Sequence, residues 1–176
     1  TGPIYIATLG IRTAVGSRAG ISARYLAEEV IEYFRNERDY RSLRGSEFQT
    51  TEWLKNITGS VDCMNTTGDQ TDTCELIINP AGQYSVQACA AGSCNPLRFN
   101  PNSTTAFYGV EDTSALQSKF SREFHFEVSA NDGSATDTPL REVKLVVHVR
   151  WNDHGEEKVY TVSDYLFNVA YSTHAQ

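Results

Sequence analysis

The first forty residues contain one long amphipathic helical pattern, and it constrains the fold more than any other feature of the chain. Between positions 22 and 39 apolar side chains recur at spacings of three and four: Ala23, Leu26, Ala27, Val30, Ile31 and Phe34. Residues near 3 to 38 can form one nearly continuous helix, which would be roughly 54 Å long. Because this exceeds the diameter of a small domain, we expect its N-terminal part to project.

The projecting part carries a second apolar strip, formed by Ile4, Ala7, Ile11, Ala14 and Val15. Apolar strips that remain in water usually mark a partner surface, and the alternative is that this strip packs on the chain's own body. The face at 23–34 is expected to bury itself on the chain's own sheet. Together the two faces give the expected assembly helix: Ile4, Ile11, Val15, Leu26, Val30 and Phe34.

The remainder of the chain has the patterns of antiparallel strands. Apolar residues alternate with polar ones over 120–128 and 143–151, and the turn sequence 152–155 predicts a hairpin between 141–151 and 157–163. A second hairpin is expected from 75–79 and 83–88. We therefore predict an α+β fold in which a long N-terminal α-helix packs on an antiparallel β-sheet.

The residues between the helix and the last strands have a mixed pattern. Residues 47–58 predict a short helix or a packed loop, and the compositions of 59–73 and of the stretch from Pro96 to Pro101 predict loops. The length of 176 residues suits one domain. We divide it into a helix (1–40), a connecting and variable region (41–110) and C-terminal antiparallel strands (118–168).

Four cysteines lie close together in the middle of the chain: Cys63, Cys74, Cys89 and Cys94. Their even number and loop-like surroundings predict two disulfides and an oxidising compartment. Three pairings are open, and we favour Cys63–Cys74 with Cys89–Cys94 because each closes a short loop. A zinc site is the rival interpretation, but no Cys-x-x-Cys pair is present.

The net charge of −7 argues against a protein that coats nucleic acid or an anionic membrane. Arginines are nevertheless concentrated in the first quarter, so Arg12, Arg18 and Arg24 are candidate DNA contacts. No run of apolar residues is long enough to cross a bilayer. The chain opens without Met, and we expect a processed or recombinant fragment.

Candidate chemistry elsewhere is weak. Four carboxylates lie close together around one predicted loop: Asp62, Asp69, Asp72 and Glu75. We interpret it as a solvated acidic loop, and a Ca²⁺ site is the minor alternative. His125 and His148 are expected on the polar faces of adjacent strands, close together and facing solvent. No catalytic motif accompanies them. We therefore predict no enzyme activity and no cofactor; a small secreted hydrolase using His and Asp is the remote alternative.

Two segments resemble bacterial type IV pilins and pseudopilins, especially the minor pilins. Residues 24–39 are similar to the family's helix segment Ala-x-x-Leu-Ala-x-Glu-Gly-Ile-Glu-x-x-Arg-x-x-Arg-Asp, with Val30 where many relatives have Gly. Residues 143–155 and 160–168 resemble the last hairpin of minor pilins, Val-x-Val-x-Trp, a Gly turn and Thr-x-Ser-x-Tyr-Leu. The resemblance covers about a third of the chain. The family's cleaved leader and hydrophobic stretch have no counterpart in this sequence.

The resemblance implies a structural subunit of a type IV pilus or of a related secretion or competence filament. It implies an ectodomain that lacks its N-terminal membrane helix, with helices bundled in the fibre and a disulfide-stabilised variable region outside. The implied partners are other pilins and, before assembly, the inner membrane. The implied location after assembly is the extracellular filament. The alternative function is a filament-tip binding module, an adhesin or DNA-capturing pilin that contacts DNA or a host surface.

Overall fold

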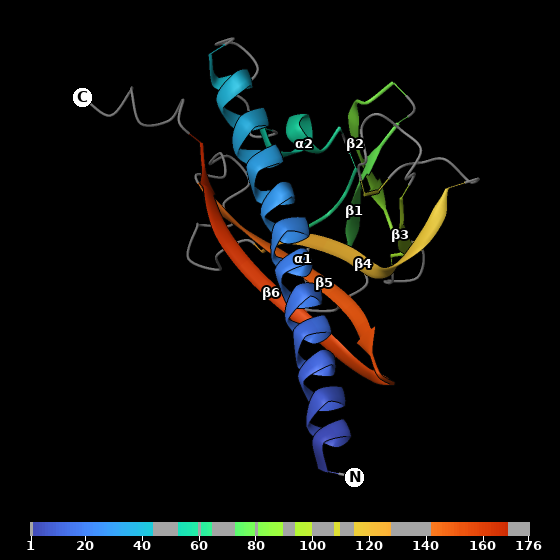
Figure 1. Ribbon diagram of the computed structural model, residues 1–176. Coiled ribbons are helices and arrows are strands. Elements are labelled where there is room, and N and C mark those ends of the chain that lie inside the picture. The colour runs from blue at the N-terminus through green and yellow to red at the C-terminus, as the bar shows by residue number, and fades with distance from the viewer. Residues whose placement is uncertain are drawn as a thin grey trace.

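The architecture is a long helix lying across one face of an antiparallel sheet (Figure 1). The computed structural model describes residues 2–43, 53–59, 61–64, 73–79, 81–89, 94–99, 108–109, 115–127 and 142–168. Within these ranges only the backbone is described for residues 2–15, Lys55 and Asn56. The predicted fold class is supported at this level: an N-terminal helix packs on an antiparallel sheet, and two disulfides are present.

Helix α1 runs without interruption over Gly2–Ser42, about 60 Å at 1.5 Å per residue. Its N-terminal part extends past the tip of the sheet's longest hairpin, as expected from the sequence (Figure 1). The point of departure lies near Gly16, because a Cβ atom there would meet Oδ2 of Asp153 at 3.3 Å. Residues 2–15 therefore form an arm of about 21 Å beyond the body.

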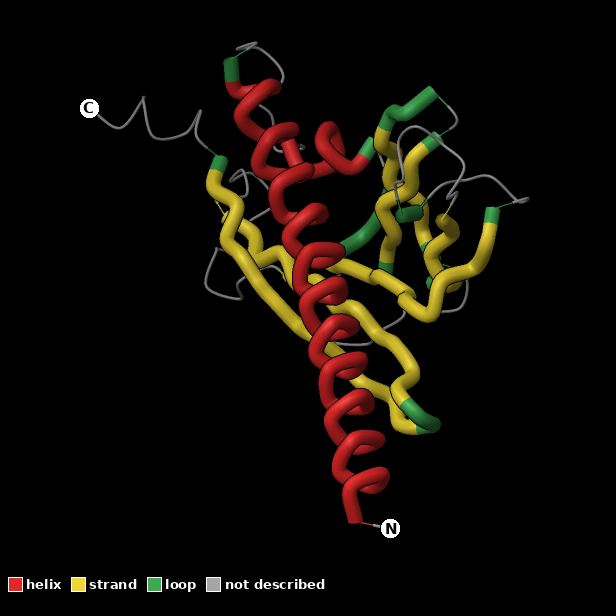
Figure 2. The backbone as a smooth tube through the Cα atoms, viewed as in Figure 1, coloured by secondary structure: helices red, strands yellow, loops and turns green. Residues whose placement is uncertain are grey.

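The sheet has six strands (Figure 2). Its main path is β2-β1-β4-β5-β6, and β3 pairs with β4 beside that path. The bounds are Cys74–Ile78 for β1, Tyr84–Ala88 for β2, Pro96–Phe99 for β3, Leu116–Glu127 for β4, Glu142–Asp153 for β5 and Glu156–Phe167 for β6. All strand pairs are antiparallel. Both predicted hairpins are confirmed, β1–β2 and β5–β6.

The tip of the β5–β6 hairpin explains its register. Asp153 pairs with Glu156, which leaves His154 and Gly155 as a two-residue loop. Both have positive φ angles, 55° and 88°, as a type I′ turn requires. Oδ1 of Asn152 accepts a hydrogen bond of 2.8 Å from the Gly155 amide. This local chemistry fixes which β5 side chains face α1.

The core lies between α1 and the inner face of the sheet. The apolar stripe of α1 is buried there, with Phe34 fully enclosed. The Phe34 ring meets Phe124 and Phe126 in edge contacts, with centroids 5.0 and 5.1 Å apart. The partners of this stripe on β5 and β6 are Val143, Leu145, Val147, Val149 and Leu166.

Two disulfides join Cys63 to Cys74 and Cys89 to Cys94, the pairing favoured from the sequence. Cys63 is also fixed by its backbone, since its carbonyl accepts a 2.8 Å hydrogen bond from the Phe126 amide. The first disulfide thereby attaches the segment before β1 to the sheet. The second joins the end of β2 to the residues that precede β3.

One sequence assignment changes, and one that was left open is decided. The stretch from Pro96 was expected to be a loop, but Pro96–Phe99 is strand β3. Pro96 is the first residue of the strand, a position where a missing amide donor is tolerated, and the buried Leu97 anchors it. The short element within 47–58 is a helix, α2, over Trp53–Thr58, and its Trp53, Leu54 and Ile57 enter the core.

Gly109 closes the gap between β1 and β3. Its carbonyl accepts a hydrogen bond from the Ile78 amide, and its own amide donates to the Arg98 carbonyl, both at 2.8 Å. Its φ is +87°, and a Cβ atom would lie 3.2 Å from the Leu76 carbonyl and 3.3 Å from Nη2 of Arg122. Only glycine satisfies both the backbone angle and this close approach.

We therefore expect Gly109→Ala to lower the free energy of unfolding by about 1–3 kcal/mol, because a non-glycine residue would be strained at this φ. Urea denaturation followed by circular dichroism measures the change. The control is Gly20→Ala, since a Cβ at Gly20 meets nothing within 4 Å and Gly20 lies inside a helix. Equal stability of the two variants would contradict the bridging role of Gly109.

Candidate functional site

The strongest candidate site is the outer surface of α1. Beyond the arm, the described part of this surface exposes three large apolar side chains, Ile21, Tyr25 and Tyr40, and the exposed Leu43 follows directly after the helix. Ile21 and Tyr25 are more than half exposed, at 57% and 67%. Side chains of this size in water on one helix face are typical of a partner contact.

The exposed Ile21 and Tyr25 continue the strip of the arm. Positions 4, 11, 18 and 25 are seven residues apart, with Arg18 as the one charged member, and so are positions 7, 14 and 21. In one continuous helix the two series lie on the same face, three and four residues apart, which is the spacing of a helix–helix seam. The strip predicted from the sequence ended at Val15, although the same heptad spacing continues to Ile21 and Tyr25. The side chains of Ile4, Ile11 and Val15 lie outside the description.

The other members of the expected assembly helix have an internal role. Leu26, Val30 and Phe34 are 5%, 0% and 0% exposed and belong to the core shared by α1 and the sheet. This agrees with the expectation that the 23–34 face packs on the chain's own sheet. These three residues are therefore not part of the exposed face of α1. They hold the helix at a fixed place on the sheet.

A buried arginine fixes the same contact electrostatically. Arg122 on β4 is 0% exposed and lies between the core phenylalanines on the face toward α1. Its Nη1 donates to the Leu26 carbonyl at 3.1 Å and to Oε2 of Glu29 at 2.5 Å, and its Nη2 donates to the Leu76 carbonyl at 2.8 Å. One guanidinium thus connects α1, β4 and β1. We call this set the Arg122–Glu29 pin.

The pin was not predicted from the sequence. The alternation over 120–128 places position 122 on the same face as Phe120 and Phe124. An arginine at an apolar-face position could therefore have indicated a buried ion pair. A buried guanidinium needs a carboxylate and carbonyl partners to offset its desolvation. Its Nε has no partner among the described residues.

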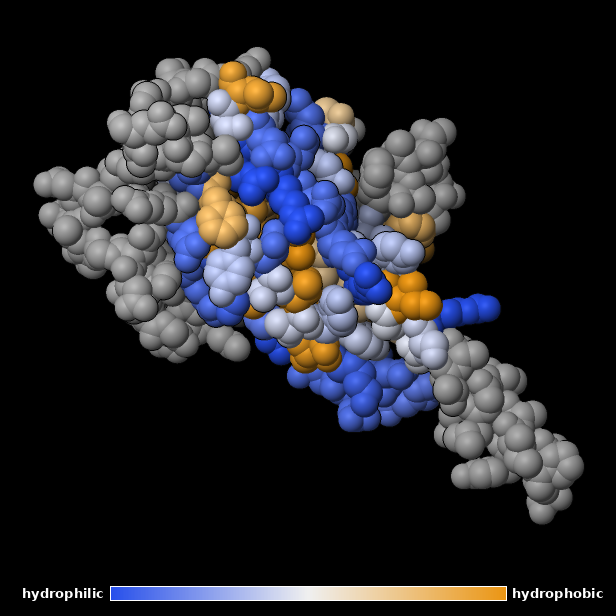
Figure 3. All heavy atoms as spheres, turned by 90° about the vertical axis from the view of Figure 1, so that its left-hand side faces the viewer, coloured by the Kyte–Doolittle hydropathy of each residue, from blue (hydrophilic) through white to orange (hydrophobic). Residues whose placement is uncertain are grey.

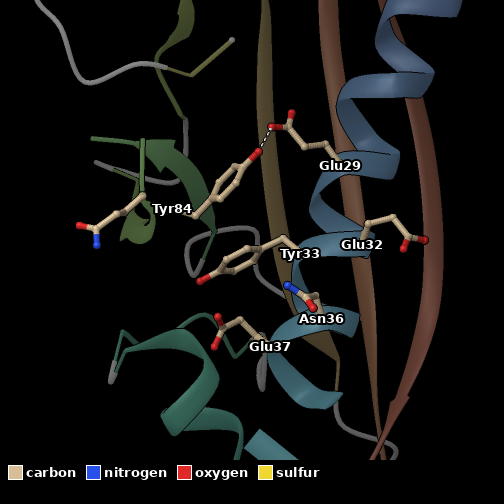
Figure 4. A pocket seen from close by; sticks show the side chains of 7 residues that line it. Glu29, Glu32, Tyr33, Asn36, Glu37 and Tyr84 are labelled. Carbon is tan, nitrogen blue, oxygen red and sulfur yellow. Dashed lines mark hydrogen bonds between the residues drawn. The ribbon is translucent and has the colours of Figure 1, made fainter. Parts of the chain in front are cut away.

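A groove lies beside the pin, between α1 and the β1–β2 hairpin (Figure 4). Its volume is about 640 Å³, and its lining is acidic, aromatic and amide in character: Glu29, Glu32, Tyr33, Asn36, Glu37, Gln83 and Tyr84. The Tyr84 hydroxyl donates to Oε1 of Glu29 at 2.9 Å, while burial and this carboxylate raise the pKa of Tyr84 to about 12. Tyr84 therefore remains protonated and supports the pin from β2.

The carboxylates of the groove already have cationic partners. Glu29 pairs with Arg122, Glu32 with Arg35 and Glu37 with Arg41. Arg35 also reaches Oδ2 of Asp164 on β6, at 2.9 Å, so it ties α1 to the far edge of the sheet. Of these partners, Arg122 and Arg35 connect α1 to the sheet, and Arg41 lies in α1 itself.

The candidate DNA contacts do not form a free basic strip among the described residues. Arg24 is exposed but pairs with Glu28 at 2.7 Å, and Glu28 raises the pKa of Arg24 further. Arg18 is exposed, and the side chain of Arg12 lies outside the description. The described arginines nearer the C-terminal end of α1 are also paired with carboxylates.

The candidate calcium ligands are only partly described. Asp62 lies in a loop, where its Oδ1 accepts a 3.1 Å hydrogen bond from the Met64 amide. Glu75 lies in β1, whereas Asp69 and Asp72 lie outside the described residues. Within the described residues no three His, Cys, Asp or Glu side chains come together as metal ligands.

His125 and His148 lie side by side on the sheet face opposite α1, as the sequence predicted, with ring centroids 5.7 Å apart. The expectation that both face solvent is wrong for His125, which is 6% exposed and whose Nδ1 has no partner among the described residues. Nδ1 of His148 lies 2.9 Å from Oγ1 of Thr161. Glu123 and Glu127 flank the pair on β4.

We expect the fold to lose stability as the pH falls below about 6.5. Burial chiefly lowers the pKa of His148 from 6.5, with His125 and Arg150 contributing. The unfolded chain then binds a proton at higher pH than the folded chain, so acid favours unfolding. Urea midpoints measured from neutral to mildly acidic pH test this, and His148→Gln should flatten the slope. An unchanged slope in that variant would assign the effect elsewhere.

None of the described helices has both the length and the apolarity that crossing a membrane requires.

A scan against protein-family models, a search of curated proteins and a search of solved structures find no match to this chain.

Proposed function

We propose that this chain is a non-enzymatic assembly subunit of a type IV pilus or of a related secretion or competence filament, a minor pilin or pseudopilin. The observation that carries the proposal is the division of one helix into two parts. One part of α1 is buried on the sheet, and the other is an arm that leaves the body near Gly16. A rigid arm held by a folded body is suited to bundling with other arms.

The resemblance in sequence adds a second line of support. The first of the two glutamates in the family's helix segment falls on Glu29, the residue that pairs with Arg122. The segment that resembles the last family hairpin forms β5 and β6, against which α1 packs. Both resembling segments therefore meet at the helix–sheet contact, which is where a pilin-like architecture would need them.

Assembly would proceed through the arm and the continuing heptad face. The face toward the viewer in Figure 3 has several small apolar areas separated by polar side chains, and no single large apolar patch. Ile21 and Tyr25 would extend the contact of the arm onto the body, and other pilins would supply the facing helices. The sheet would then face outward.

The two disulfides support a location outside the cytoplasm, because such bonds persist in oxidising compartments. We place the subunit in the cell envelope before assembly, anchored in the inner membrane by a segment preceding residue 1, and in the extracellular filament afterwards. The region pinned by the disulfides would be displayed on the outside.

Ile21→Asp in the full-length gene is expected to reduce filament incorporation at least tenfold, because it places a charge in the proposed seam. Quantitative immunoblotting of sheared filaments measures the effect. Leu116→Asp is the matched control, since Leu116 is 63% exposed on β4, far from the arm in sequence. Both variants should keep the parent urea midpoint. Wild-type incorporation of Ile21→Asp would refute the proposal.

A further inference from the structure

The sheet divides along one edge of β4. At one end of that edge β1 pairs through Cys74 and Phe124, and at the other end β3 pairs from Pro96 to Phe99, with a register shift between Pro96 and Arg98. Between β1 and β3 the bridge through Gly109 replaces continuous strand pairing. β1 and β3 therefore lie side by side without a shared ladder, and a small hollow remains between them.

The hollow is a pocket of about 140 Å³ with a mixed lining. Its polar side chains are one carboxylate, one guanidinium and two carboxamides, and its walls include two apolar side chains: Glu75, Arg98, Gln87, Asn95, Ile77 and Pro96. The formal charge of this lining is zero. A pocket of this size accommodates one small ring and not a drug-sized ligand.

The pocket faces away from α1. In β1 the side chains of Cys74, Leu76 and Ile78 are buried, and Glu75 and Ile77 alternate with them. Successive side chains of a strand point to opposite faces, so Glu75 lies on the face opposite the core. The Cys89–Cys94 disulfide lies between Gln87 and Asn95 in the sequence and restrains this side of the pocket.

Glu75 has unused hydrogen-bonding capacity. It is half-buried, and its carboxylate has no hydrogen bond and no ion pair among the described residues. Burial raises the pKa of Glu75, and Arg122 opposes the rise from behind the strand. Arg98 is already engaged, since its Nη1 donates to the Ala115 carbonyl at 3.3 Å. The lining therefore offers an unpaired carboxylate and two neutral carboxamides, and its one cation, Arg98, is already held by a carbonyl.

We propose that this pocket binds one ring of a neutral saccharide. Glu75 accepts hydrogen bonds from ring hydroxyls, the Gln87 and Asn95 carboxamides both donate to and accept from them, and Pro96 with Ile77 contacts the apolar face of the ring. An anion would meet the Glu75 carboxylate, and a purely apolar ligand would leave this carboxylate buried without a partner. Binding needs only the isolated chain, so the proposal goes beyond filament assembly and is tested separately from it.

The test is a titration of the ¹⁵N-labelled 176-residue chain with methyl glycosides of neutral hexoses and N-acetylhexosamines, followed by amide chemical shifts. We expect saturable shifts confined to β1, β2 and residues 94–98, with a millimolar Kd for at least one glycoside. Glu75→Gln should weaken this affinity about tenfold, because a charge-assisted hydrogen bond becomes a neutral one.

Glu157→Gln is the control, since it makes the same chemical change at an exposed position of β6 outside the pocket. It should bind as the parent chain does. The dispersion of each spectrum verifies the fold, and Gln87→Ala replaces Glu75→Gln if that variant unfolds. The proposal is overturned if no glycoside gives saturable shifts, if glycine or acetate shifts the same amides as strongly, or if neither pocket variant weakens binding.

Discussion

Glu29→Ala is expected to lower the free energy of unfolding by about 3–5 kcal/mol, because it leaves the guanidinium of Arg122 buried without a counter-charge. Arg122 is 0% exposed and would keep only its two carbonyl acceptors, on Leu26 and Leu76. Glu29 is itself 25% exposed, so most of the loss comes from the stranded cation. Urea denaturation measures the change as a lower midpoint.

The double variant Glu29→Ala/Arg122→Met distinguishes the pin from a simple packing contact. Replacing both members of a buried ion pair by apolar groups is often neutral, so the double variant should recover most of the lost stability. Glu28→Ala is the neighbouring control, since Glu28 pairs only with the exposed Arg24, and its effect should remain below about 1 kcal/mol. A double variant as unstable as Glu29→Ala would exclude a stranded charge as the cause.

Phe34→Ala is the second substitution with a large expected effect, a loss of about 3–5 kcal/mol. The Phe34 ring is 0% exposed and meets Tyr33, Phe124 and Phe126 with centroids 5.0 to 5.1 Å apart. Removing it opens a cavity at the centre of the helix–sheet contact. The urea midpoint should fall while the dependence of stability on denaturant remains the same.

Tyr25→Ala is the matched control for Phe34→Ala, because it removes an aromatic ring from the same helix at a position that is 67% exposed. Surface substitutions of this kind usually change stability by less than about 0.5 kcal/mol. If the two substitutions lowered the free energy of unfolding equally, α1 would not be anchored through Phe34.

Local patterns in the sequence were sufficient for the main elements. The apolar spacing over 23–34 predicted the buried stripe of α1, and the alternation with the turn at 152–155 predicted β5 and β6. Short loops were sufficient to favour the observed cysteine pairs. In each case the determining residues are close in the chain, so the pattern and the structure depend on the same few positions.

The features that the sequence did not reveal depend on distant residues. Arg122 and Glu29 are 93 positions apart, and nothing local indicates that they meet. β3 begins with a proline, which is typical of loops, and becomes a strand only because β4 offers an unpaired edge. The pocket at Glu75 takes residues from three strands and from the Gly109 bridge. Such sites exist only after the sheet has formed.

The continuity of α1 has a mechanical consequence. A rod clamped at one end acts as a lever, so a slight tilt at the clamp becomes a large sideways displacement at the free tip. Substitutions around Arg122 that leave the chain folded should therefore alter the pitch of any fibre built from it, although none of them touches a neighbouring subunit.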